Sequence, residues 1–127
     1  MKKLFSALLL AGMTLSAGAV TPLWMRDVKI SPDGSTIAFT YKGDIFTVPV
    51  TGGTARRLTT ASSYESMPVW SPDGKTIAFA SDREGGQDIY VMNAEGGAPK
   101  RITFNSASEL PQAFSPDGKS VIYHAFI

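Results

Sequence analysis

The chain contains one histidine, His124, and a Ser-His-Asp device would need it to contact both an acid and a serine. No G-x-S-x-G, H-E-x-x-H, P-loop or Rossmann fingerprint accompanies this histidine. His124 alternates with Ile122 along an apolar run, which is typical of a residue that packs between layers. We therefore interpret His124 as a packing residue and expect no catalytic residue in the 127 residues of this chain.

Acidic and glycine-rich segments offer a second kind of chemistry, the binding of metals or phosphate. Asp82 and Glu84 lie in a glycine-rich stretch and could hold calcium, but the D-x-D-x-D-G spacing of a calcium loop is absent. The chain has no cysteine, which excludes disulfides and thiolate metal sites. The pairs Gly52-Gly53 and Gly96-Gly97 lack the following helix that a phosphate cradle needs. We expect neither a metal nor a cofactor.

A tetrapeptide, Ser-Pro-Asp-Gly, organises the chain and begins at Ser31, Ser71 and Ser115. Proline fixes the first central φ angle of a turn, aspartate can bond its own backbone, and glycine accepts a positive φ. A β-rich run follows each copy, so we predict a tight turn between two antiparallel strands at all three places. The spacings of 40 and 44 residues are typical of four-stranded propeller blades.

The rest of the sequence repeats with the same period. Unit one covers about residues 21–60 and unit two about 61–104, whereas unit three, about 105–127, contains only the first hairpin. The predicted fold class is all-β: an incomplete β-propeller with two four-stranded antiparallel blades plus the first hairpin of a third. Because such a stack cannot close into a ring, we expect these residues to be the N-terminal part of a longer protein.

Charged residues recur at the blade period around the last strand of each unit. Arg56-Arg57 in unit one matches Lys100-Arg101 in unit two, in strands that we expect at about 55–59 and 100–103. We interpret these cations as edge charges that discourage pairing between sheets. Asp44 and Asp88 recur at the start of the third strand of each unit, and we expect each to bond a backbone amide there.

Binding residues are expected where the units differ. The Ser-Pro-Asp-Gly and Gly-Gly turns share one end of the blades, the turn face, and the connections that vary share the other end, the loop face. The variable segments are residues 61–68, 81–87 and 105–111. Variation confined to one face favours a binding surface for peptides or a protein partner. The candidate binding residues on the loop face are Tyr64, Glu65, Arg83 and Glu109.

The first residues form a pattern of their own. Lys2 and Lys3 precede an apolar core at 4–15, and Ala17-Gly18-Ala19 is a small-residue cleavage site. This order predicts a signal peptide over residues 1–19, cut after Ala19. The product would be exported, periplasmic or secreted, with no membrane span left. Its formal charge would be −1, from 10 basic and 11 acidic residues, which does not suit a nucleic-acid binder.

Unit two resembles the WD40-like propeller repeat of TolB-type proteins. The resemblance is carried by Trp70-Ser-Pro-Asp-Gly-Lys75, Ile77-Ala78-Phe79, Ser81-Asp82-Arg83, Asp88 to Asn93, Gly96-Gly97 and Arg101-Ile102-Thr103. It implies a propeller blade, and it is less informative about function because that repeat serves several unrelated proteins.

The start of the chain resembles exported tricorn-type serine proteases, through Pro22 to Asp27, the first Ser-Pro-Asp-Gly, residues 37–46 and Arg56 to Thr59. The resemblance implies a substrate-filtering propeller, and the family's catalytic residues would lie in domains downstream of Ile127. Two alternatives stay open: a TolB-like protein-binding propeller of the cell envelope, and the propeller of a prolyl-oligopeptidase-like hydrolase. The sequence beyond residue 127 would separate the three.

Overall fold

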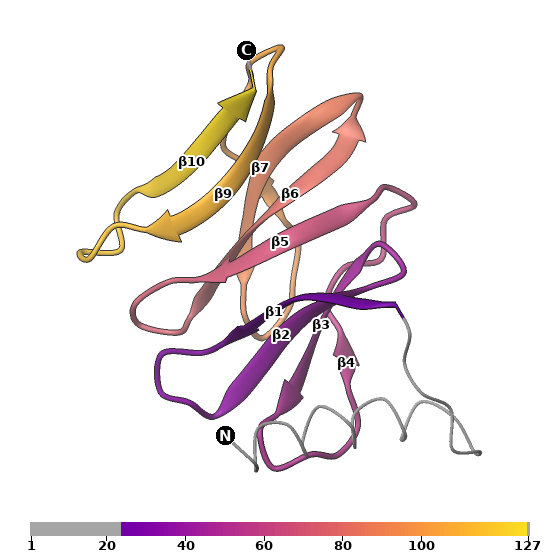
Figure 1. Cartoon of the computed structure of the whole chain (residues 1–127), viewed down its shortest axis with the longest axis vertical. Coiled ribbons are helices and arrows are strands. Elements are labelled where there is room, and N and C mark those ends of the chain that lie inside the picture. Colours follow the sequence, from indigo (N-terminus) through magenta and orange to yellow (C-terminus); the bar gives the residue numbers. More distant parts are fainter. Residues whose placement is uncertain (1–23, 127) are drawn as a thin grey trace.

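The computed structural model describes residues 24–126, and every regular element within them is a β-strand (Figure 1). The predicted signal peptide and its cleavage site at Ala19 lie outside the described residues. Within the described part of the chain, no helix is long and apolar enough to cross a membrane.

Three antiparallel sheets follow one another along the chain (Figure 1). The first sheet has the order β1-β2-β3-β4, the second β5-β6-β7-β8, and the third is the hairpin β9-β10. The first sheet contains β1 (Met25–Ile30), β2 (Thr36–Tyr41), β3 (Asp44–Pro49) and β4 (Arg56–Arg57). The second contains β5 (Glu65–Trp70), β6 (Thr76–Glu84), β7 (Gly86–Asn93) and β8 (Lys100–Arg101). The hairpin contains β9 (Ser108–Phe114) and β10 (Val121–Phe126). The predicted fold class is confirmed.

Two elements differ from the prediction. The last strand of each complete blade is only two residues long. In blade one, the Ile45 amide donates to the Thr59 hydroxyl at 2.9 Å, so a side chain takes the place of a backbone carbonyl where the strand pairing ends. The expected loop at 81–87 is instead the end of a long hairpin. There β6 runs to Glu84 and β7 begins at Gly86, and Gly85 turns the chain with a φ of 104°.

Each Ser-Pro-Asp-Gly segment forms the predicted turn with the same bonds. In the first copy the Asp33 carboxylate accepts the Ser31 hydroxyl at 2.6 Å and the Ser35 amide at 3.0 Å. Gly34 closes the turn at a φ of 75°. Successive turns also pack on each other, since a Cβ added to Gly74 would lie 3.9 Å from the Pro32 ring. The turns therefore join neighbouring blades as well as neighbouring strands.

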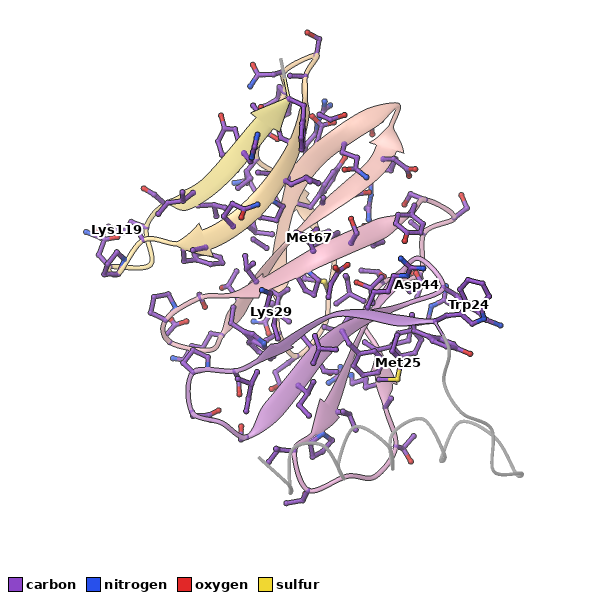
Figure 2. All side chains as sticks on the ribbon, viewed as in Figure 1. Trp24, Met25, Lys29, Asp44, Met67 and Lys119 are labelled. Atoms are coloured by element: carbon purple, nitrogen blue, oxygen red, sulfur yellow. The ribbon has the colours of Figure 1, made fainter. Side chains whose placement is uncertain are left out.

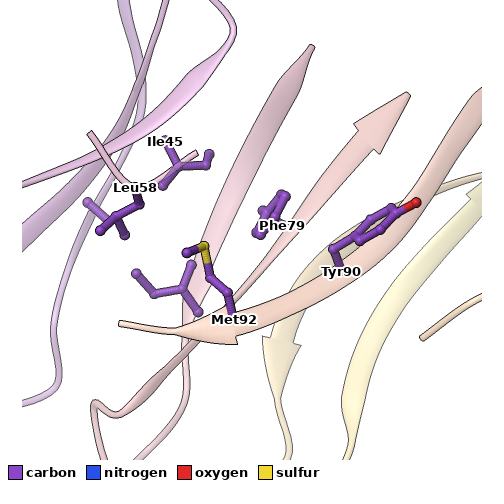
Figure 3. Close-up of a cluster of buried hydrophobic side chains, with 7 residues drawn as sticks. Ile45, Leu58, Phe79, Tyr90 and Met92 are labelled. Atoms are coloured by element: carbon purple, nitrogen blue, oxygen red, sulfur yellow. The ribbon is translucent and has the colours of Figure 1, made fainter. Parts of the chain in front are cut away.

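The core lies between the blades (Figure 3). Ile77 and Phe79 of β6 are fully buried and belong to one cluster with Ala38, Ile45 and Leu58 of the first blade. The intervening Ala78 belongs to a second cluster, which extends to Phe114 and Val121 of the hairpin. A blade thus presents bulky side chains of its second strand to the preceding blade and a small one to the next.

A bulge in the innermost strand provides a further link between blades one and two. Asp27 in β1 and Met67 in β5 occupy equivalent positions with φ angles of 53° and 56°. Figure 2 labels Met67 on β5. The Asp27 carboxylate accepts hydrogen bonds from the Met67 amide and the Thr40 hydroxyl, each at 3.2 Å. The Trp70 indole also donates to the Lys29 carbonyl at 3.1 Å.

Truncating the central aromatic of the interblade core should destabilise the chain strongly. We expect Phe79→Ala to lower the free energy of unfolding by about 3–5 kcal/mol, because removal of the buried phenyl group loses its packing contacts and leaves a cavity. Phe104→Ala is the matched control, since Phe104 is 72% exposed, and it should cost less than about 1 kcal/mol. Urea titration followed by circular dichroism measures both, and equal losses would contradict this location of the core.

The first turn should make stability depend on pH in acid. The Ser31 hydroxyl, followed by the amide and hydroxyl of Ser35, lowers the pKa of Asp33 from 3.8 to about 2. The turn's contribution is therefore complete above the unfolded pKa and is lost as the pH falls through about 2. We expect Asp33→Asn to reduce the fall in Tm between about pH 4 and pH 2, whereas Glu95→Gln should not. Identical acid profiles for the two variants would refute this.

Candidate functional site

The four candidate binding residues all lie near the loop face, but they are not equally accessible. Tyr64 immediately precedes β5 and is 47% exposed, whereas the side chain of Arg83, in β6, is 22% exposed. Glu65 and Glu109 are fully buried and belong to β5 and β9. Our expectation that these residues lie in loops is wrong for Glu65, Arg83 and Glu109. Their role in binding stays a prediction.

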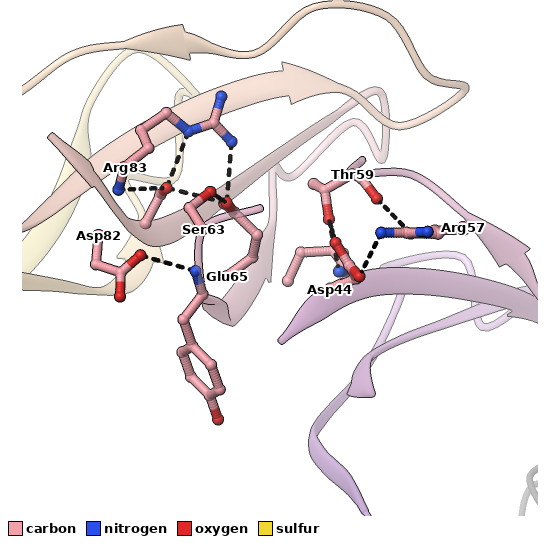
Figure 4. A network of polar contacts seen from close by, with 10 residues as sticks. Asp44, Arg57, Thr59, Ser63, Glu65, Asp82 and Arg83 are labelled. Atoms are coloured by element: carbon pink, nitrogen blue, oxygen red, sulfur yellow. Dashed lines mark hydrogen bonds and ion pairs between the residues drawn. The ribbon is translucent and has the colours of Figure 1, made fainter. Parts of the chain in front are cut away.

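A polar network fixes Arg83 (Figure 4). One oxygen of Glu65 accepts the Ser81 hydroxyl at 3.0 Å, the Arg83 guanidinium at 3.1 Å and also the Ser63 hydroxyl. Arg83 donates a further bond from Nε to Ser81 at 2.9 Å, and its guanidinium lies over the Tyr90 ring, 4.5 Å from the centroid. Glu65 is thus a positioning residue, and Arg83 and Ser63 are the members of the network that reach solvent.

Tyr64 is held by its own blade and by blade one. Its amide donates to the Asp82 carboxylate at 2.7 Å, and its ring lies against Gly43 in the β2–β3 turn. A Cβ added to Gly43 would come within 3.0 Å of the ring, so the glycine leaves the space that the tyrosine uses. The amide of Glu65 donates to the Gly43 carbonyl at 2.7 Å. The tyrosine therefore lies at the seam between blades one and two.

A second polar network lies within blade one (Figure 4). Asp44 pairs with Arg57 at 2.7 Å and accepts the Thr59 hydroxyl at 3.0 Å, and that hydroxyl in turn receives the Ile45 amide. We expected Asp44 to bond a backbone amide directly, but Thr59 stands between them. Arg57 is more than an edge charge, because it ties the short β4 to the start of β3.

The second blade repeats the ion pair and the amide-to-threonine bond, but its Asp88 Oδ1 has no hydrogen-bond partner among the described residues. Arg101 pairs with Asp88 at 2.9 Å, and the Ile89 amide donates to the Thr103 hydroxyl at 2.8 Å. The matching sequence signal is the recurrence of an acid before the third strand and of Arg-x-Thr at the last strand. These residues hold the outer strand of the blade, so we assign them to the architecture.

His124 lies on the outer face of the hairpin and is exposed, so the predicted packing between blades is not present within the described residues. Its ring stacks on Phe126 with centroids 4.5 Å apart. Among residues 24–126, no three acidic or imidazole side chains are grouped closely enough to hold a metal ion.

Three pockets lie toward the turn face, whereas we predicted binding at the loop face, and one of them lies between the second and third Ser-Pro-Asp-Gly turns. The other two involve large side chains that precede these turns. The first of these two, of about 410 Å³, is lined by Asp33, Arg56, Trp70 and Glu95 among others, and the Arg56 guanidinium bridges the blades by pairing with Glu95. The second, of about 280 Å³, is mainly apolar. Its signal in the sequence is the large side chain that precedes each Ser-Pro-Asp-Gly copy: Ile30, Trp70 and Phe114.

Comparison with protein families places the chain among propellers of proteases. The profile of the family described as the tricorn protease N-terminal beta propeller domain matches residues 22–125. A solved tricorn protease structure superposes with a TM-score of 0.67 at 26% identity, over 77% of this chain and 10% of that one.

Solved TolB structures are similar to the same extent. The protein assigned as TolB from Agrobacterium tumefaciens has a TM-score of 0.68 and 34% identity, over 78% of this chain and 37% of that one. TolB from Acinetobacter baumannii has a TM-score of 0.66 and 29% identity, over 77% and 26% of the two chains.

Two curated relatives are named as peptidases. Dipeptidyl-peptidase 5 of Porphyromonas gingivalis is 36% identical over 111 residues, which cover 67% of this chain and 16% of the relative. The uncharacterized peptidase YuxL of Bacillus subtilis (strain 168) is 43% identical over 56 residues, which cover 40% of this chain and 8% of the relative. The chain thus matches less than a fifth of the length of either relative.

Removing the guanidinium from the buried network should destabilise the fold. We expect Arg83→Gln to cost about 2 kcal/mol, below the ~3–5 kcal/mol of a fully buried pair because Arg83 is partly exposed. The double variant Glu65→Gln/Arg83→Gln should lose less than the sum of the single changes. Arg56→Gln disrupts an exposed pair and should cost less than about 1 kcal/mol. Additive losses in chemical denaturation would contradict the coupling of Glu65 and Arg83.

Proposed function

The chain belongs to the tricorn protease N-terminal β-propeller family, and from this premise we propose that it is the non-catalytic propeller segment of a longer serine peptidase. In this role it binds peptides and guides them toward a catalytic centre elsewhere in the protein. The short coverage of both peptidase relatives supports a segment of a larger enzyme. Export to the periplasm or the medium is part of the proposal and rests on the sequence of residues 1–19.

One observation supports the peptide-binding role above the others: the loop face carries both a guanidinium that is fixed in advance and an exposed aromatic ring. Arg83 is held by Glu65 and Ser81, so little side-chain entropy is lost when its remaining donors bind a peptide carbonyl. Tyr64 adds a large, rigid contact surface on the same seam. Rings of this kind and arginine are the side chains that most often dominate binding energy in protein interfaces.

A second candidate function is a protein-binding propeller of TolB type. The similarity to the Agrobacterium protein, at 34% identity over 78% of this chain, favours it. The two functions make different demands, because a guiding propeller accepts unstructured peptides of many sequences and a scaffold retains one folded partner. A propeller ahead of a prolyl-oligopeptidase-like hydrolase would share the peptide-binding role, and the relatives named as peptidases suit it as well.

Peptide binding at the seam can be measured with labelled, unstructured peptides. We expect Tyr64→Ala to weaken their Kd by about tenfold or more, because the exposed ring supplies the largest contact area there. Lys119→Ala, an exposed change in the turn of the third hairpin on the opposite face (Figure 2), should leave Kd unchanged. Fluorescence anisotropy provides the readout.

The guiding role has its own test in the full-length protein. If the propeller delivers peptides, Tyr64→Ala should reduce kcat/KM for long peptides and leave that for short ones unaltered. Equal effects on both lengths would indicate a defect at the catalytic centre. Tight binding of a folded partner without any peptide binding would favour the TolB-type function.

A further inference from the structure

Glu109 occupies a position whose chemistry differs from blade to blade. The pairing registers of the three hairpins place Met25 opposite Tyr41, Glu65 opposite Ser81, and Glu109 opposite Ala125. The first blade therefore folds with a methionine at this position. A buried carboxylate is not required by the blade architecture, and its presence in the third hairpin needs another reason.

The carboxylates of the second and third blades have different partners. Glu65 receives the guanidinium of Arg83 and two hydroxyl groups. Glu109 is equally buried, yet its Oε1 receives only the Asn105 amide, at 2.6 Å. In the described part of the chain, the Oε2 atoms of both carboxylates have no hydrogen-bond partner, so the two sites differ in the donors at Oε1. Within residues 24–126 no cationic side chain pairs with Glu109.

The repeat shows which partners the third hairpin lacks. Ala125 stands where the second blade has Ser81, so one hydroxyl donor is replaced by a methyl group. The 44-residue spacing between the second and third turns aligns Ile127 with Arg83, so the sequence supplies no guanidinium at that position. Glu109 has kept the acceptor of the network while the donor on the neighbouring strand has been replaced.

A carboxylate removed from water is unfavourable unless a cation or several donors compensate it. The second blade shows which group satisfies this position, since the guanidinium of Arg83 reaches Glu65 from the loop face. The amide that bonds Glu109 belongs to Asn105, which is exposed, so the carboxylate lies one side chain beneath the surface. A cation that displaces Asn105 would take the place that Arg83 has in blade two.

We propose that Glu109 is a subsite for a basic group of a bound peptide, a guanidinium or an ammonium ion. The inference rests on the proposed peptide-binding function and specifies its substrate class: peptides that contain an arginine or a lysine. The same cationic chemistry could be supplied by a basic residue of the protein outside residues 24–126, and the experiment separates the two sources.

The test uses the full chain and a pair of peptides that differ only in arginine against its neutral isostere citrulline. We expect the arginine peptide to bind about tenfold to a hundredfold more tightly, the range for a hydrogen bond to a charged group. Glu109→Gln should abolish that preference, and Glu95→Gln, the same charge change at an exposed position on the turn face, should preserve it. Titration calorimetry measures all six affinities, and the wild-type pair needs no variant to fold.

Several outcomes would overturn the proposal. Equal affinity of the two peptides for the wild-type chain would exclude a cation subsite, even if Tyr64→Ala still weakened both and so upheld the proposed function. No binding of either peptide would overturn the proposed function. In that case argininamide alone is the probe, and a response unchanged by Glu109→Gln would overturn the subsite as well. A Tm lowered by Glu109→Gln without any arginine preference would show that the cation comes from the protein itself.

Discussion

The contact between bulky and small faces of adjacent blades is the constraint on which the other features depend. Phe79 and Ile77 fit against Ala38 because the alternation of the second strand places large side chains on one face and alanine on the other. Apolar burial between sheets provides the driving force, and the side-chain volumes determine how closely two sheets approach. A different order of large and small side chains in the second strand would change the distance between the sheets, and with it the contacts at the ends of the blades.

The polar residues at the seam act within the spacing that this core determines. The Glu65 amide donates to the Gly43 carbonyl, and the Tyr64 ring lies beside that glycine. Both contacts require the spacing and alignment that the core gives to the two sheets. Arg83 is then oriented by Glu65 and Tyr90. In the proposed function, recognition at the loop face therefore depends on two blades together, because the seam is formed by residues of both.

The sequence predicted the features that depend on local chemistry and on period. The turn at Asp33, the strand order and the apolar second strands follow from residues close together in the chain. The burial of Glu65 and Glu109 was missed because it depends on a neighbouring blade. The positive φ at Asp27 was missed as well, since no residue type signals a bulge stabilised by its contact with Met67.

The packing of each turn on the next has an evolutionary consequence. Pro32 lies against Gly74 and Pro72 against Gly118, so the proline of one copy and the glycine of the following copy share a joint. Selection then acts on the two residues of a joint together, because a substitution at either one alters the packing of the turn in the neighbouring repeat. Identical joints also make repeats interchangeable, so a gene duplication that adds a blade inserts a unit whose two ends already fit.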